Sequence, residues 1–142
     1  MNARIKRVKR LALAAESARN ARERTLVEAR RELDARAETL ARAQAELDAG
    51  AARWLEAESS AELEHASARR RTLARHVEIE ASKTDEAKGR VQVVEQAAVE
   101  ARRDERRLEI LVEGLEAGEA TRRKKAEQKI GDEHAARMGR NA

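Results

Sequence analysis

Residues 26–54 read LVEARRELDARAETLARAQAELDAGAARW, and this stretch decides the fold. Large apolar side chains recur in it every seven residues, at Leu26, Leu33, Leu40, Leu47 and Trp54. A constant seven-residue interval is typical of a left-handed coiled coil, in which these side chains form the seam between two helices. The positions three residues after each of them are mostly alanine or glycine. We therefore expect a partner helix that approaches closely on that side.

A second heptad pattern follows later in the chain. It begins near residue 73, and its apolar seam residues are Val91, Val94, Leu108, Val112 and Leu115. Glutamates interrupt this pattern, and it fades after Leu115. The two patterns are out of phase with each other, so we expect a break in the helix between them.

The best candidate for this break is the segment 57–72. Ser59 followed by Glu62 has the spacing of a capping box, which starts a helix. Three consecutive arginines at 69–71 suit a solvated bend, and the segment 82–89 is a second candidate. We prefer the first candidate because it divides the chain into near-equal arms that can pair along their length.

These patterns predict an all-α fold, in which two long helices form a single elongated antiparallel coiled-coil hairpin. The first helix is expected at about 3–58, the bend within about 57–72 and the second helix at about 72–138. In this pairing Gly114 and Gly118 lie opposite the alanine-rich segment 12–18, where they would let the two backbones approach closely. We expect the free chain to be a monomer.

The amino-acid composition excludes several other classes of protein. The 142 residues include 31 alanines and one tryptophan but no phenylalanine, tyrosine, proline or cysteine, and 41% of them are charged. So few large side chains do not fill a globular core, and without cysteine there are no disulfides or thiolate metal sites. No apolar run is long enough to span a membrane or to act as a secretory signal, so we expect a cytoplasmic protein.

The sequence contains no recognisable catalytic motif, so we expect neither enzymatic activity nor a cofactor. His76 and Glu80 lie one helical turn apart and offer two metal ligands. A structural zinc site needs four ligands, and no further histidine or cysteine is near. We therefore expect these two residues to be ordinary solvated side chains on a charged helix.

Two basic clusters are more informative. The first ten residues carry a charge of +5, and residues 122–125 read RRKK. An antiparallel hairpin brings both clusters to one end, where they would attract an acidic partner. A protein partner is favoured over a membrane surface or solvated charge without a partner. Nucleic acid is not expected, because stacking aromatic side chains are missing.

Trp54 is the only aromatic residue, and it has two interpretations. It occupies a seam position, which predicts burial near the bend. Alternatively, Trp54 and its neighbour Leu55 form a docking spot for a partner.

Five segments spread over the chain carry a family resemblance. They are residues 4–11 (RIKRVKRL), 54–58 (WLEAE), 102–112 (RRDERRLEILV), 127–133 (EQKIGDE) and the closing Arg-Asn-Ala at 140–142. With these segments the chain resembles the YscO/FliJ family, the central stalk proteins of type III secretion ATPases. The opening segment and the closing Arg-Asn-Ala favour the injectisome branch, which serves bacterial virulence, over the flagellar branch.

The resemblance implies a helical hairpin similar to the gamma-subunit stalk of rotary ATPases. In this family the paired termini enter the pore of a hexameric secretion ATPase, and the far end faces the cytoplasmic ring of the export gate. Some members also bind export chaperones. We therefore expect a peripheral location at the cytoplasmic face of the secretion apparatus. The ATPase-facing residues expected from the resemblance and the basic clusters are Ile5, Arg7, Val8, Arg10, Leu11, Arg123, Lys124 and Ile130. The expected export-gate-facing tip consists of Leu55, Arg69, Arg70 and Arg71.

A second hypothesis from a different class is a general coiled-coil scaffold or adaptor protein with no ATPase partner. Gene neighbourhood distinguishes the two, since a stalk protein is encoded next to its ATPase.

Overall fold

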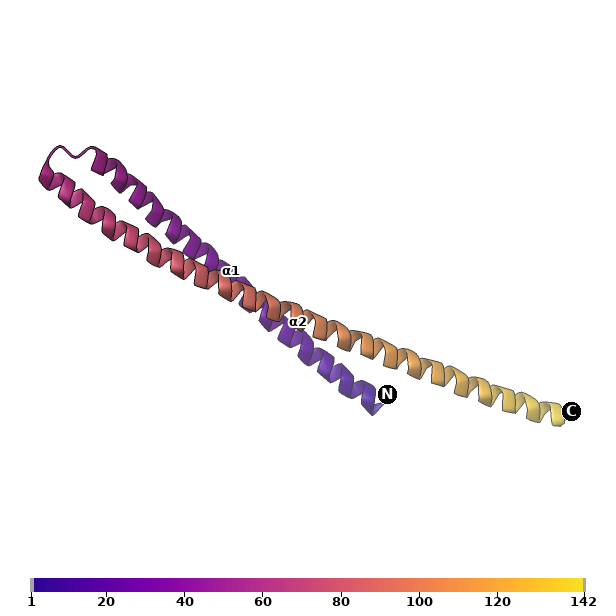
Figure 1. Ribbon diagram of the computed structural model, residues 1–142. Helices are drawn as coiled ribbons and strands as arrows, with labels where there is room; N and C mark the ends of the chain where they lie inside the picture. The colour runs from indigo at the N-terminus through magenta and orange to yellow at the C-terminus, as the bar shows by residue number, and fades with distance from the viewer. Residues whose placement is uncertain (1, 142) are drawn as a thin grey trace. The chain divides into compact units, whose positions relative to one another are not determined.

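The structure, a computed structural model, describes residues 2–141; Met1 and Ala142, the last residue of the closing Arg-Asn-Ala, lie outside the described residues. Within this range the chain forms two helices and no strand, namely α1 (Ala3–Leu55) and α2 (Ser60–Arg140) (Figure 1). The predicted all-α fold is confirmed. Residue contacts divide the chain into two units. The hairpin unit is Ala21–Val99, and the terminal unit combines Met1–Asn20 with Glu100–Ala142.

Both helices begin at a capping side chain. At the start of α1 the Asn2 side-chain oxygen accepts a 2.9 Å hydrogen bond from the backbone N–H of Arg4. At the start of α2 the Ser59 hydroxyl oxygen accepts a 3.1 Å bond from the N–H of Glu62. The Glu62 carboxylate in turn accepts a 3.0 Å bond from the N–H of Glu58. The Ser59–Glu62 bond confirms the helix start expected at these residues and satisfies an N–H group that has no partner inside the helix, whereas the Glu62 carboxylate bonds the N–H of Glu58 and not that of Ser59, as a full capping box would.

The turn between the helices covers residues 56–59, at the very beginning of the expected bend. α1 ends at Leu55, close to the expected boundary, but α2 begins at Ser60, twelve residues earlier than expected. The alternative bend at 82–89 lies inside α2. The prediction of near-equal arms is also wrong, because α1 has 53 residues and α2 has 81. The physical reason is that residues 60–72 contain no glycine or proline, and adjacent arginines project from a helix in different directions.

In the hairpin unit α1 and α2 run antiparallel on either side of this turn (Figure 1). The seam follows the first heptad pattern: Leu26 is only 4% exposed, and the later large seam residues of α1 are half-buried. These half-buried residues are Leu33, Leu40, Leu47 and Trp54. On α2 the half-buried seam residues Val91 and Val94 lie between the fully buried Ala87 and Ala98.

One polar layer interrupts this apolar seam. Glu80 and Thr84 are buried between the two helices. The Thr84 hydroxyl donates to the backbone carbonyl of Glu80 at 2.8 Å and also lies 3.3 Å from the carbonyl oxygen of Arg36 on α1. The layer therefore links α2 to α1 by a polar contact in the middle of the hairpin unit.

In the terminal unit the first part of α1 packs against the part of α2 that follows Glu100. Ile5 and Val8 are buried in this pair, and the second heptad pattern supplies half-buried partners on α2. These partners are Leu108, Val112 and Leu115. Every residue from 120 to 141 is exposed, in agreement with the fading of the pattern after Leu115.

The close approach expected at Gly114 and Gly118 is not present. A Cβ atom built at either glycine meets nothing within 4 Å, so both glycines face open space. The earlier start of α2 shifts the pairing by several residues, and Ala12 therefore faces Val112 instead of a glycine. The close approach lies instead at Gly50, where a built Cβ would be 3.2 Å from the Cδ1 atom of Leu73.

Candidate functional site

The most extended exposed surface of the terminal unit is the tail segment, residues 120–140 of α2. α2 continues through these residues past the point where α1 begins (Figure 1). The tail segment carries seven Lys or Arg and three Asp or Glu residues, a net charge of +4. Its two large apolar side chains, Ile130 and Met138, are both exposed, Ile130 by 67%. The tail segment is thus a cationic helix with no packing partner in its own chain.

The basic start of α1 lies beside the beginning of the tail segment. Ile5 shares a small depression with Glu116, Glu119, Ala120 and Arg123. The Arg123 guanidinium forms a 3.2 Å ion pair with Glu119, one turn away. The structure therefore brings the two basic clusters of the terminal unit together, as the antiparallel pairing predicted.

The residues expected to face an ATPase do not all lie on one surface. Arg7, Arg10 and Leu11 are exposed on α1, and Arg123, Lys124 and Ile130 are exposed on α2. Ile5 and Val8 are buried between the helices. The expectation that these two side chains face an ATPase is not met in the chain itself. Ile5 lies three heptads before Leu26 in the same register, so Ile5 and Val8 face α2 and stabilise the helix pair.

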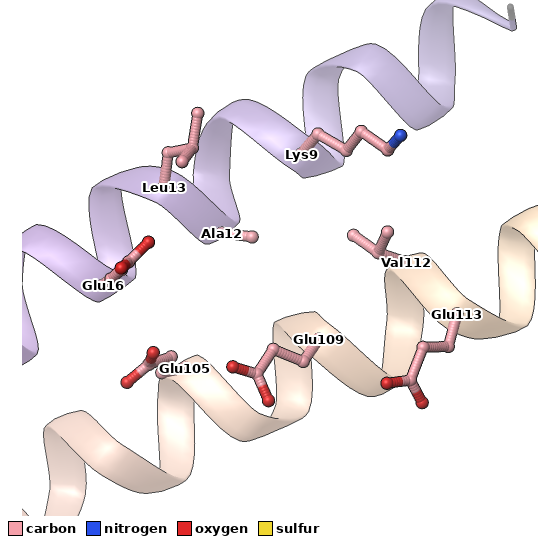
Figure 2. Close-up of a pocket in the computed structure, with 8 residues that line it drawn as sticks. All are labelled: Lys9, Ala12, Leu13, Glu16, Glu105, Glu109, Val112 and Glu113. Carbon is pink, nitrogen blue, oxygen red and sulfur yellow. The ribbon is translucent and has the colours of Figure 1, made fainter.

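An acidic groove runs between the two helices of the terminal unit. It has a volume of about 390 Å³ and is lined by Lys9, Ala12, Leu13 and Glu16 of α1 and by Glu105, Glu109, Val112 and Glu113 of α2. Figure 2 shows Ala12 and Val112 pointing towards each other from opposite helices, with the glutamates along α2 beside them. Because alanine and valine are short, the helix surfaces leave space there. Leu13 stands at the edge of the groove and is 66% exposed.

Ion pairs hold the carboxylates of the groove in place but leave it acidic. Glu105 pairs with Arg19, which lies seven residues before Leu26 in the register of the first heptad pattern, so a seam glutamate of the second pattern meets a seam arginine of the first. Arg106 lies 3.2 Å from Glu109 and 3.9 Å from Glu113. The ammonium of Lys9 is engaged by Glu116 at 2.6 Å.

This groove was not expected from the sequence. The glutamates within the second heptad pattern and the arginines within the first were the available signal. With the bend placed too late, Arg19 and Glu105 did not fall opposite each other.

The turn region of the hairpin unit presents a different surface. Trp54 is half-buried, and its indole N–H donates a 3.0 Å hydrogen bond to the hydroxyl of Ser67. Arg70 and Arg71 line a shallow depression of about 440 Å³ together with Trp54, Ser67 and Ala74. The remaining expected tip residues, Leu55 and Arg69, are exposed, Leu55 by 78%. Trp54 thus packs in the seam, as the first interpretation predicted, and also borders an arginine-lined surface; the docking of a partner there stays a prediction.

No group of three or more potential ligand side chains in the described part of the chain is arranged to hold a metal ion. His76 is exposed, whereas Glu80, one turn later, is buried in the seam. Across residues 2–141 no helical stretch combines the length and the apolar character needed to cross a membrane.

In comparisons with known proteins, no family model matches the chain, and neither a curated protein nor a solved structure matches it. The family expected from the sequence therefore stays a prediction.

Proposed function

We propose that the chain is the non-catalytic central stalk of a type III protein secretion system. In this proposal the basic surface of the terminal unit binds the hexameric secretion ATPase, and the turn region contacts the cytoplasmic ring of the export gate. Export chaperones are included as further partners because the chain resembles the YscO/FliJ family. The stalk would work as a peripheral protein at the cytoplasmic face of the apparatus.

The observation that supports this proposal most directly is the basic end of the terminal unit. Arg7 and Arg10 lie near the start of α1, beside the part of α2 that begins the tail segment and carries the 122–125 cluster, and all of them are exposed. Like-signed charges concentrated on one surface speed the encounter with an acidic binding site. The exposed apolar side chains Leu11 and Ile130 then supply contacts that slow dissociation.

The proposed contact with the export gate is supported by the arginine-lined surface of the turn region. Arg70 and Arg71 border the depression beside Trp54, and Leu55 projects into solvent nearby in the sequence. A cationic rim around apolar and aromatic side chains suits an acidic protein surface.

Charge reversal tests the proposal. A chain carrying Arg7→Glu, Arg10→Glu, Arg123→Glu and Lys124→Glu should bind the cognate ATPase at least tenfold more weakly, and secretion should fall. Its helicity should be unchanged, because all four side chains are exposed and surface substitutions change stability little. Affinity is measured by titration with the purified ATPase, and helicity by circular dichroism.

The matched control reverses the tip arginines, Arg69, Arg70 and Arg71. This variant should keep its affinity for the ATPase and lose affinity for the export-gate ring. If the tip variant lost ATPase binding and the terminal variant kept it, the two surfaces would have exchanged roles. If neither the wild type nor any variant bound the ATPase, the general scaffold hypothesis would replace the stalk.

A further inference from the structure

The tail segment lacks the interactions that keep a helix of its length folded. Gly131 and Gly139 lie inside it, and each glycine in a helix interior costs about 1 kcal/mol relative to alanine. In proteins, most of the stability of a helix comes from the packing of one face against another element rather than from helix propensity. All of its side chains are exposed within its own chain. The tail segment therefore needs a surface to pack against in order to stay helical.

The acidic groove has the complementary chemistry. Four glutamates and one lysine line it, and ion pairs with Arg19 and Arg106 offset only part of the negative charge, whereas the tail segment carries a net charge of +4. The groove also offers Leu13 as an exposed apolar contact, and the tail segment offers Ile130 and Met138. Ile130 and Met138 are eight residues apart and so lie on one side of the helix. An amphipathic helix docked in a groove between two others is a common recognition mode.

A tail segment does not reach the groove of its own chain. α2 is continuous from Ser60 to Arg140, so the tail segment leads directly away from the part of α2 that lines the groove (Figure 1). To fold back, α2 would have to break after Glu113, where the chain remains helical. The occupant must therefore come from another molecule.

We propose that the tail segment docks in the acidic groove of a second copy of this chain, so that two copies exchange tail segments in a symmetric dimer. In such a dimer each copy gives one helix and receives one. The lengths agree: the 21 residues of the tail segment extend about 31 Å, and the 18 residues of α1 in the terminal unit extend about 27 Å. A tail segment therefore spans the groove, which residues 9–16 of α1 line.

This inference does not depend on the proposed function, because it concerns the purified chain alone. The monomer expected from the sequence is then the form present at low concentration or high salt. Since the contact joins opposite charges at the protein surface, raising the salt concentration should weaken the dimer.

Two charge-reversal variants of the full chain test the exchange. The groove variant carries Glu109→Lys and Glu113→Lys, and the tail variant carries Arg122→Glu, Lys124→Glu and Lys125→Glu. Each variant alone juxtaposes like charges, so each should dimerise at least tenfold more weakly than the wild type. An equimolar mixture should form a heterodimer, because both of its tail–groove contacts again join opposite charges. Mass is measured by sedimentation equilibrium over a range of concentrations at low and high salt.

The matched control carries Glu46→Lys and Glu78→Lys, two exposed residues of the hairpin unit. It makes the same charge change outside the groove and should dimerise as the wild type does. Circular dichroism checks that every variant keeps its helices, and Ile130→Glu provides a second tail variant that leaves the groove and its ion pairs untouched. A wild type that stays monomeric at low salt and high concentration would overturn the proposal. A dimer whose affinity is the same in the wild type, the groove variant and the tail variant would also overturn it. An equimolar mixture of the two variants that forms no heterodimer would do so too.

Discussion

The hairpin unit and the terminal unit are built from the same two helices, but they bury different side chains. In the hairpin unit four apolar residues, Leu26, Ala43, Ala87 and Ala98, are almost completely buried. In the terminal unit the fully buried apolar residues are Ile5 and Val8. The seam there includes the Arg19–Glu105 ion pair, and it ends before the tail segment.

This difference has an energetic consequence. Apolar burial stabilises by about 25 cal/mol per Å², whereas ion pairs near the surface contribute about 1 kcal/mol or less. The hairpin unit, which has more buried and half-buried apolar side chains in its seam, should therefore supply most of the stability. The terminal unit leaves charged and apolar side chains exposed, and such side chains are available for binding. The heptad repeat thus stabilises the helix pair where leucine occupies the seam, and it leaves side chains available for binding where charged residues occupy the seam.

The largest effect is expected at Leu26, the most buried large side chain of the hairpin unit. Leu26→Ala removes three carbons from a site with little room to collapse, so the free energy of unfolding should fall by about 2–4 kcal/mol. Val27→Ala is the matched control, because Val27 is largely exposed on the next position of the same helix. Its effect should stay within about 0.5 kcal/mol. Urea unfolding followed by circular dichroism measures both.

If Leu26→Ala were as mild as Val27→Ala, the apolar seam would not be the source of stability in the hairpin unit. The contrast with the terminal unit would then lose its basis.

A smaller effect of the opposite sign is expected at Glu80, the charged residue within the apolar seam. No described donor reaches its Oε2 atom, which is buried, and its other oxygen lies 3.5 Å from the ammonium of Lys83. A buried carboxylate that is incompletely paired is costly to desolvate. Glu80→Leu, which keeps a similar volume, should therefore raise the free energy of unfolding by about 1–2 kcal/mol.

Glu78→Leu controls for the removal of a negative charge, since Glu78 is exposed two positions earlier. It should change stability by less than about 0.5 kcal/mol. A Glu80→Leu chain that is less stable than the wild type would mean that this carboxylate contributes to the helix pairing rather than opposing it.

The seam of both units follows directly from the sequence. Side chains seven residues apart lie on the same face of a helix, and in a helix pair this is the face towards the partner helix. Leu26, Leu33, Leu40 and Leu47 all lie on that face. The start signal at Ser59 was readable too, because a capping box uses local hydrogen bonds. Where periodicity or local capping determines the structure, the sequence was sufficient.

The pairing of distant residues did not follow, because it depends on the position of the turn. The preference for equal arms placed the turn several residues too late, and each residue of α2 was then matched to the wrong partner on α1. The acidic groove was missed for this reason, since it needs Ala12 to face Val112. The depth of burial was also beyond the pattern: Leu26 and Leu33 occupy equivalent positions of one heptad repeat, yet Leu26 is buried and Leu33 is half-buried.

The smallest effects are expected at the glycines, and they test where the helices approach most closely. At Gly114 an added methyl group meets open space, so Gly114→Ala should stabilise the chain by roughly 0.5–1 kcal/mol through helix propensity alone. At Gly50 the added methyl group would lie 3.2 Å from Leu73 Cδ1, and the crowding should offset most of the same gain. Ala117→Gly, an exposed position one turn from Gly114, should lose about as much as Gly114→Ala gains. Unfolding midpoints in urea compare the three variants. If Gly50→Ala stabilised as much as Gly114→Ala, the helices of the hairpin unit would not be in close contact at Gly50, and the difference between the two units would be one of charge alone.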